Sequence, residues 1–336
     1  MSSPMRAIRL YAPQQISLEE VPIPTPGPGD LLIRVRAATT CGTDLKAFRR
    51  GHPMIPMPGP LGHEYSGEVV AVGDGAKFKA GDAVMGVHTA PCQRCYWCLH
   101  GQENLCETIM ATMVMGSYAE YLLIPKRIAD LNVFPKPDSI SFEIASLLEP
   151  LACVAQGISH LPITPDSSVL VIGPGAIGLM FVAALKASGV QGVTLAGRNE
   201  ARLAVGKQLG AETCFVTEIP TDNPNRFDIV IECTGQVSVW ERSVDYARRG
   251  GTVMLFGGCP SGTRASFDTR HVHYDQIALI SPFHFGTQAV RMSRDWLLNG
   301  SMDLSPIISG ERSLEDCPAV LEDLEASKGL KYVFKP

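Results

Sequence analysis

Four cysteines stand in one short segment at a spacing that suits a single metal ion. Two, two and seven residues separate them in PCQRCYWCLHGQENLC, which contains Cys92, Cys95, Cys98 and Cys106. The two-residue gaps let the backbone curl around an ion, and Gly101 relaxes the return that brings in the fourth thiol. We predict a structural zinc; the alternative is a pair of disulfides or unrelated buried cysteines. A site closed by four thiolates has no open coordination position, so the chemistry must lie elsewhere.

A second set of metal-ligand residues is dispersed through the first half of the chain. Cys41 lies in CGTD, His63 and Glu64 lie in GHE, and Glu149 lies in LLEPLACV. Together they supply a thiolate, an imidazole and up to two carboxylates, and three of them would leave a fourth position free for water or substrate. Each residue alone has an ordinary structural interpretation. The set predicts a catalytic zinc.

A glycine-rich turn indicates a dinucleotide. The sequence GPGAIG follows the apolar run SVLVIG and opens the helical run LMFVAALKASG. A GxGxxG turn in a strand–turn–helix context lets the backbone approach a pyrophosphate at the helix N-terminus. The alternative is an ordinary glycine turn. The predicted cofactor contacts here are Gly173, Gly175, Ala176, Ile177, Gly178 and, after a later apolar run, Thr234.

The end of the next strand bears on which dinucleotide binds. An acidic residue that accepts the ribose 2′-hydroxyl is expected about 20 residues beyond the turn, yet the strand GVTLAG ends in Gly197, followed by Arg198 and Asn199. Gly197 removes a charge that would repel a 2′-phosphate, and Arg198 with Arg202 offers guanidinium groups to bind one. This favours NADP over NAD. The alternative is that Arg198 is a solvated residue at a helix start and that NAD binds with little ribose selectivity.

Length and composition limit the class of protein. A chain of 336 residues exceeds what one core usually organises, so we expect two domains. The formal net charge is −5 and no run of Lys and Arg occurs, which argues against nucleic-acid and membrane partners. The start has no apolar signal segment, and no stretch approaches the roughly 20 apolar residues of a membrane span. We expect a cytoplasmic enzyme with reduced cysteines and a small-molecule substrate.

The pattern of apolar residues along the sequence changes near residue 150. Before it, short alternating apolar runs separated by Gly and Pro predict an irregular β domain. After it, apolar strands alternate with helical runs, as in a parallel doubly wound sheet. Near the C-terminus we expect a helix around 288–298, a short strand near 304–308 and a terminal strand at YVFK.

These motifs together resemble one family. CGTD, GHE followed by YSGEVVAVG, the four-cysteine segment, EPLACV and GPGAIG occur in the order seen in zinc-dependent medium-chain alcohol dehydrogenases, and the resemblance spans the chain. It is closest to the sorbitol (L-iditol), threonine and polyol dehydrogenase branch, because Glu149 stands where simple alcohol dehydrogenases have a second catalytic cysteine.

The resemblance implies an α/β architecture in two domains. A GroES-like irregular β catalytic domain would comprise residues 1–150, with the structural zinc lobe at about 91–107, and the C-terminal return at 285–336. A Rossmann domain with a doubly wound parallel sheet would occupy 151–284, and the active site would lie in the cleft. It also implies a homodimer or homotetramer.

The mechanism implied by the family is hydride transfer assisted by a Lewis-acid zinc. Thr43 matches the hydroxyl that relays the proton, Asp44 the carboxylate that orients the histidine ligand, and Glu64 a carboxylate that binds zinc directly or through water. Many relatives have a histidine at the outer end of the relay, where this chain has Lys46. The relay would then end in water or in His52, or Lys46 would contact the cofactor.

The predicted reaction interconverts a secondary alcohol of a polyol, cyclitol, aminocyclitol or sugar and its ketone. A threonine 3-dehydrogenase-like activity and a simple secondary-alcohol dehydrogenase are the alternatives, and a non-catalytic NADP-binding protein is the alternative from another class. Loops at 48–57, 112–115 and 283–285 are expected to line the substrate pocket.

Overall fold

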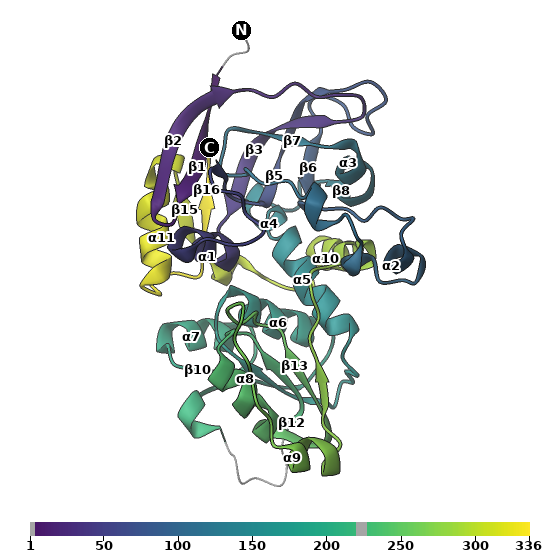
Figure 1. Cartoon of the computed structure of the whole chain (residues 1–336), viewed down its shortest axis with the longest axis vertical. Coiled ribbons are helices and arrows are strands. Elements are labelled where there is room, and N and C mark those ends of the chain that lie inside the picture. The colour runs from purple at the N-terminus through teal and green to yellow at the C-terminus, as the bar shows by residue number, and fades with distance from the viewer. Residues whose placement is uncertain (1–3, 220–226) are drawn as a thin grey trace. The chain divides into compact units, whose positions relative to one another are not determined.

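The computed structural model of the chain describes residues 4–219 and 227–336, which form two compact units (Figure 1). The first unit comprises Met1–Ala152, Phe285–Gly300 and Ile308–Pro336, and the second comprises Cys153–His284 and Ser301–Ile307. The sequence predicts a C-terminal return over 285–336, which would include residues 301–307. These residues belong to the second unit because the 3-10 turn Ser305–Ile307 packs against helix α7 (Glu200–Gln208).

Two antiparallel-rich sheets build the first unit. Strand β3 (Leu31–Thr39) shows the pattern in its middle: Ile33, Val35 and Ala37 are buried, whereas Arg34 and Arg36 between them are exposed, which is the period-two pattern of a half-buried strand. The smaller sheet has the order β2 (Gln15–Pro22), β1 (Pro4–Ala12), β4 (Gly59–Pro60). The larger has the order β15 (Ile308–Arg312), β16 (Lys331–Phe334), β3 (Leu31–Thr39), β5 (Glu64–Val72), β6 (Ala83–Gly86), β8 (Val133–Pro135), with β7 (Tyr121–Ile124) also pairing with β3.

Helices and a shared apolar core complete the first unit. Tyr65, Tyr118 and Phe334 are among the largest fully buried side chains of this core. The α-helices are α1 (Gly42–Arg50), α2 (Tyr96–Leu99), α3 (Lys126–Asn132), α4 (Phe142–Ala145), α5 (Leu148–Ser159), α10 (Thr287–Leu298) and α11 (Cys317–Glu325). Single 3-10 turns lie at Glu103–Leu105, Met110–Thr112 and Leu314–Asp316. Helix α5 begins in this unit and continues into the second.

The prediction of a strand near 304–308 is wrong, because the strand begins later in the chain. Residues Ser305–Ile307 form the 3-10 turn, and the strand β15 begins only at Ile308, where it pairs in parallel with β16. Pro306 explains the shift, because proline has no N–H to donate to a sheet ladder. The expected helix around 288–298 and the terminal strand are both present, as α10 and β16.

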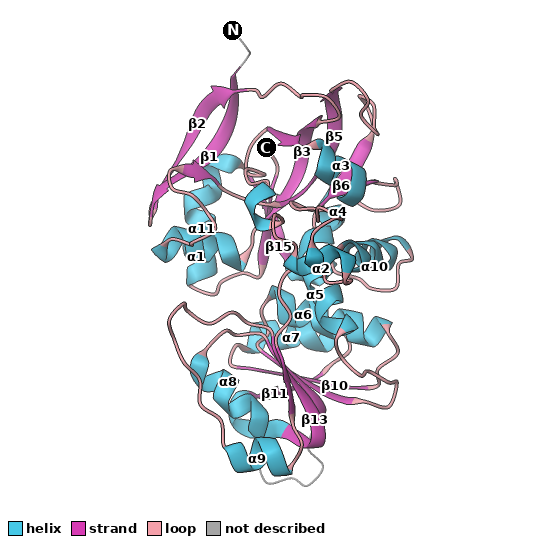
Figure 2. Ribbon diagram, turned by 45° about the vertical axis from the view of Figure 1, so that its right-hand side comes forward, coloured by secondary structure: helices cyan, strands magenta, loops and turns pink. Residues whose placement is uncertain are grey.

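The second unit is a parallel sheet covered by helices (Figure 2). The strand order is β11 (Glu212–Phe215), β10 (Gly192–Gly197), β9 (Ser168–Ile172), β12 (Phe227–Glu232), β13 (Ala247–Leu255), β14 (Ala278–Ile280). Its helices are α6 (Ala176–Ala187), α7, α8 (Val237–Ser243) and α9 (Thr269–Tyr274), with 3-10 turns at Val216–Glu218 and Val244–Tyr246. The order reverses between β9 and β12, and the carboxyl ends of strands at such a point are where doubly wound sheets bind ligands.

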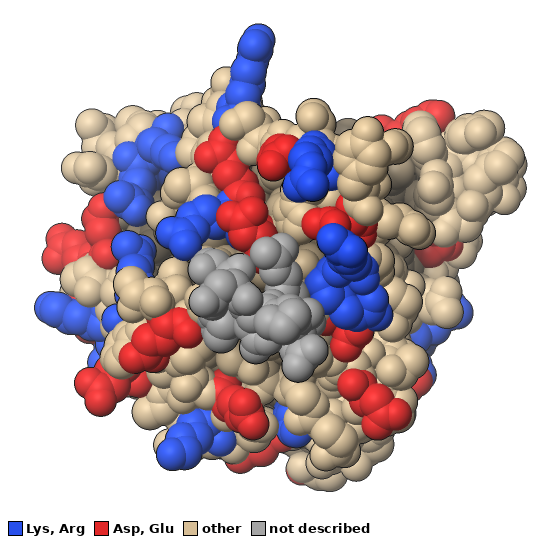
Figure 3. Space-filling model, turned by 90° about the horizontal axis from the view of Figure 1, so that it is seen from below, with Lys and Arg blue, Asp and Glu red and all other residues tan. Residues whose placement is uncertain are grey.

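Two surface properties agree with the composition. On the face drawn in Figure 3, Lys and Arg are interspersed with Asp and Glu and do not merge into one basic surface. Among the residues that the structure describes, none of the helices has the length and apolar character needed to cross a membrane.

Candidate active site

The turn after strand β3 presents the first predicted ligand. Cys41 is the N-cap of α1: its sulfur accepts from the N–H of Thr43 at 3.4 Å, and Asp44 accepts from the N–H of Cys41 at 3.2 Å. These two hydrogen bonds fix the Cys41 sulfur at the start of the helix, and cysteine is one of the ligands that zinc prefers in proteins.

Cys41, His63 and Glu64 come together around one point. One ligand atom from each lies within 4.8 Å of the other two, although 21 residues separate Cys41 from His63. His63 immediately precedes β5, and Glu64 is the first residue of that strand, which pairs with the end of β3 next to Cys41. A thiolate, an imidazole and a carboxylate at this spacing form a donor set that suits zinc.

The Asp44 carboxylate lies next to Nδ1 of the His63 imidazole. Its Oδ1 lies 3.4 Å from Nδ1 of His63, and its Oδ2 accepts from the hydroxyl of Tyr118 at 2.7 Å. Burial favours the neutral carboxyl, but His63 and Tyr118 outweigh burial, so the pKa of Asp44 lies below its usual value. A carboxylate on Nδ1 leaves Nε2 as the metal-binding nitrogen and fixes the ring orientation.

Glu64 is held by a residue that the sequence analysis missed. Nζ of Lys331, the first residue of β16, lies 2.6 Å and 2.5 Å from the two carboxylate oxygens, and it also donates to the carbonyl of Thr40 at 2.7 Å. The hydroxyl of Thr39 donates to the same carboxylate. Burial alone would lower the pKa of Lys331, but the Glu64 carboxylate outweighs it and raises the pKa above its usual value. A lysine that opens an apolar terminal strand was the available signal, since a buried lysine requires a partner.

Glu149 lies outside the three-residue cluster and contacts a second histidine that the sequence analysis did not select. Its Oε1 is 3.4 Å from Nδ1 of His88, and the rings of His88 and His63 have centroids 4.8 Å apart. Burial raises the pKa of Glu149 to about 7, with the Glu64 carboxylate acting in the same direction and His63 against it. His88 was recognisable only as a lone histidine in GVHTA, before the cysteine segment.

The predicted relay residues lie on one helix and the loop after it. Thr43 is half-buried in the first turn of α1, and Lys46 is exposed in the second. His52 is half-buried, and burial together with the charges of Lys46 and Arg50 lowers its pKa. Of the predicted pocket loops, the segment 283–285 crosses from the second unit into the first, and its Phe285 meets the ring of His88 edge-on at 5.9 Å.

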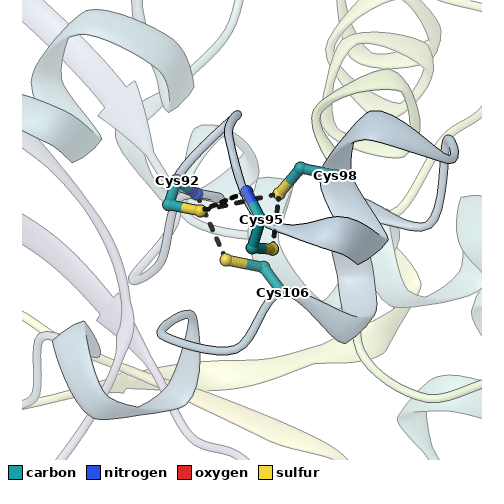
Figure 4. A group of neighbouring side chains, drawn as sticks. All are labelled: Cys92, Cys95, Cys98 and Cys106. Atoms are coloured by element: carbon teal, nitrogen blue, oxygen red, sulfur yellow. Dashed lines mark hydrogen bonds between the residues drawn. The ribbon is translucent and has the colours of Figure 1, made fainter.

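The four cysteines of the predicted structural site point toward a common centre (Figure 4). All four are free thiols, which removes the disulfide alternative. The sulfur of Cys98 lies 4.0 Å from that of Cys92 and 3.5 Å from that of Cys95. A tetrahedral zinc with Zn–S bonds of about 2.3 Å requires sulfurs about 3.8 Å apart, so the group fits this ion.

The cofactor turn has the geometry that a dinucleotide requires. Gly173, at φ +109°, immediately follows β9, and Gly175 is the N-cap of α6. A Cβ on Gly178 would stand 2.0 Å from the carbonyl oxygen of Gly173, whereas a Cβ on Gly175 would meet nothing within 4 Å. The third glycine therefore permits close packing, and the second leaves open space beside the helix N-terminus. Thr234, after β12, has its methyl group 2.8 Å from the Cβ position of Gly173.

The strand that ends at Gly197 is followed by the two predicted arginines. Arg198 is exposed, and Arg202 is half-buried in the first turn of α7, where its N–H donates to the capping side chain of Asn199 at 3.1 Å. Burial lowers the pKa of Arg202.

A parallel doubly wound sheet with a GxGxxG turn, joined in one chain to a β domain with two metal-type residue clusters, defines a zinc-binding dehydrogenase. The chain belongs to this family: residues 27–138 match the alcohol dehydrogenase GroES-like domain, and residues 176–298 match the zinc-binding dehydrogenase domain. The predicted fold class and the prediction of a zinc- and NAD(P)-dependent oxidoreductase acting on a small alcohol are confirmed.

Several relatives cover most or all of the chain. D-altritol 5-dehydrogenase of Agrobacterium fabrum is 35% identical over 82% of this chain and 83% of its own. L-threonine 3-dehydrogenase of Escherichia coli is 30% identical over 98% of this chain and 99% of its own. A structure from Sinorhizobium meliloti 1021, described as a zinc-binding dehydrogenase bound to NADP, superposes with a TM-score of 0.91 at 30% identity, covering both chains completely.

Proposed function

We propose that this enzyme interconverts a secondary alcohol of a polyol, cyclitol, aminocyclitol or sugar and its ketone, with NAD(P) as the hydride acceptor. The observation that carries the proposal is the convergence of Cys41, His63 and Glu64, with Glu149 close by, in a chain that also has a dinucleotide turn. The altritol dehydrogenase relative supports a polyol substrate.

The chain's own residues have separable roles in this proposal. Cys41 and His63, with Glu149 or Glu64, would hold the catalytic zinc, and Asp44 would keep His63 oriented. A zinc ion supplies Lewis-acid chemistry, since it lowers the pKa of a hydroxyl and polarises a carbonyl. The Thr43 hydroxyl would carry the alcohol proton outward, towards water, His52 or Lys46. The cysteines Cys92, Cys95, Cys98 and Cys106 would hold the second, structural zinc.

We further propose that NADP is preferred over NAD. Gly197 leaves no acidic side chain at the strand end, and Arg198 with Arg202 supplies positive charge there. The Sinorhizobium meliloti relative was solved bound to NADP. Dissociation constants of both cofactors for the unmodified enzyme test this proposal, and equal values would contradict it.

A threonine 3-dehydrogenase activity is the second candidate, because the Escherichia coli enzyme of that name matches nearly the whole chain. A panel of polyols, cyclitols, simple secondary alcohols and L-threonine, each assayed with both cofactors by nicotinamide absorbance, separates the candidates. Turnover of L-threonine alone would favour the second. Absence of turnover on the whole panel, in protein shown to contain zinc and to bind the cofactor, would favour a non-catalytic NADP-binding protein.

The family resemblance also supports a homodimer or homotetramer in the cytoplasm. Light scattering coupled to size-exclusion chromatography measures the oligomeric state, and a monomer at working concentration would contradict the proposed homodimer or homotetramer.

A further inference from the structure

The proline in the cofactor turn occupies the space beside the end of strand β10. A Cβ placed on Gly197 would stand 2.4 Å from Cγ and 2.5 Å from Cδ of Pro174, and 3.4 Å from Cδ2 of Leu203. Both Pro174 and Gly197 are buried. Carbon atoms in contact stand about 3.5–4.0 Å apart, so any side chain at position 197 would require about 1 Å of movement.

Pro174 has little freedom to make that movement. Its ring has no rotatable side chain, and the N–H of the preceding Gly173 donates to the carbonyl of Ala196 at 2.9 Å, which ties the turn to β10. Gly173 is in turn close to Thr234 on its other side. A side chain at position 197 would therefore displace the turn that carries the three glycines of the cofactor site.

We propose that Pro174 and Gly197 form a specificity-determining pair, in which the Pro174 ring excludes the acidic side chain that would accept a ribose 2′-hydroxyl and repel a 2′-phosphate. The ligand class that the pair admits is a dinucleotide with an anionic group on the ribose 2′-oxygen, bound beside Arg198. This inference rests on the proposed NADP preference, and it adds a steric cause that the sequence alone did not reveal. The missing acid at position 197 is a consequence of packing against Pro174.

The first experiment tests the steric contact without any cofactor. Gly197→Ala adds only the clashing Cβ and should lower the melting temperature of the cofactor-free protein, whereas Pro174→Ala/Gly197→Ala should recover most of the loss. Gly192→Ala in the same strand is the matched control, because its Cβ would meet its nearest atom at 3.4 Å, an ordinary contact. If Gly197→Ala has the same melting temperature as the unmodified protein and Gly192→Ala, the contact does not exist and the proposal is overturned.

The second experiment tests specificity by measuring dissociation constants for NADP and NAD. Gly197→Asp alone should weaken both cofactors, because it displaces the turn. Pro174→Ala/Gly197→Asp should recover NAD binding and disfavour NADP by about tenfold or more, because the new carboxylate accepts a charge-assisted hydrogen bond from the ribose 2′-hydroxyl of NAD and repels a 2′-phosphate. If Gly197→Asp alone produces this switch, Pro174 has no role and the proposal is overturned. Equal affinities in the unmodified protein would contradict the proposed NADP preference, whereas the switch in the double variant would still support the pair.

Discussion

Lys331 and Glu64 lie 267 residues apart in the chain and form a buried ion pair in the candidate active site, with Nζ of Lys331 2.6 Å and 2.5 Å from the two oxygens of Glu64. Lys331 is 2% exposed and Glu64 is fully buried, so neither charge is solvated by bulk water. The pair changes the electrostatics of the proposed zinc site. With one thiolate and two carboxylates the protein would contribute three negative charges, and Lys331 reduces this to two, which a divalent ion balances.

The Lys331–Glu64 pair should be required for stability. Lys331→Met leaves the Glu64 carboxylate buried without its cation, and we expect the free energy of unfolding to fall by about 3–5 kcal/mol. Lys331→Met/Glu64→Gln removes both charges and should be less destabilised than either single variant. Chemical denaturation of the four proteins measures the coupling. Additive effects would show that the pair contributes no interaction of its own.

Two zinc ions per chain should be separable by mutation. Metal analysis of the unmodified protein should give about two equivalents, and Cys95→Ser should lose one of them together with thermal stability, because the apo segment loses its cross-link. Cys41→Ser should keep the zinc of the four-cysteine segment and the fold, and lose turnover. One equivalent in the unmodified protein would contradict the assignment.

Arg127 should stabilise the zinc of the four-cysteine segment. Its guanidinium donates to the carbonyl of Pro91 at 3.0 Å and to the hydroxyl of Thr108 at 3.0 Å, and its Nη2 lies 3.6 Å from the sulfur of Cys106. Four thiolates around a divalent ion have a net charge of −2, which a cation at this distance partly offsets. Arg127→Gln should weaken zinc affinity by about 10- to 100-fold. Zinc transfer to a chromogenic chelator measures it, with the exposed Arg94→Gln in the same segment as control.

Arg198 should discriminate between the cofactors. If its guanidinium binds the 2′-phosphate, Arg198→Ala should weaken NADP by about 10- to 100-fold, the range of one charge-assisted hydrogen bond, and leave NAD nearly unchanged. Titration of each cofactor by fluorescence or calorimetry gives the two constants, and NAD binding to the same variant serves as the internal control. A parallel loss for both cofactors would indicate a structural role for Arg198.

A substrate with two neighbouring hydroxyls should have a higher kcat/KM than a substrate with one. A polyol-type site that engages two adjacent oxygens would give 2,3-butanediol a higher kcat/KM than 2-butanol, a mono-alcohol of equal chain length. Steady-state kinetics with the preferred cofactor provide the comparison. Comparable efficiency on the two compounds, with no activity on larger polyols, would place the enzyme with simple secondary-alcohol dehydrogenases.

Features encoded within a few consecutive residues were predictable from the sequence. The spacing of Cys92, Cys95, Cys98 and Cys106 already defines a group that can enclose an ion, and GPGAIG between an apolar strand and a helix already defines the turn. The apolar runs of the parallel sheet were also predictable, since buried strands of this kind are apolar along their whole length. In each case the partners are neighbours in the chain, so local geometry brings them together in any fold that satisfies the pattern.

Contacts between distant segments were decided only by the tertiary structure. Lys331 meets Glu64 because β16 returns to pair with β3, and His88 meets Glu149 because β6 leads into the same site as α5. Gly197 illustrates the limit most clearly, because the sequence indicated a missing charge and the structure revealed a missing volume beside Pro174. Residue type and spacing specify which chemical groups are available, but a steric or ionic contact depends on distances of a few ångströms, which only the packing of distant segments determines.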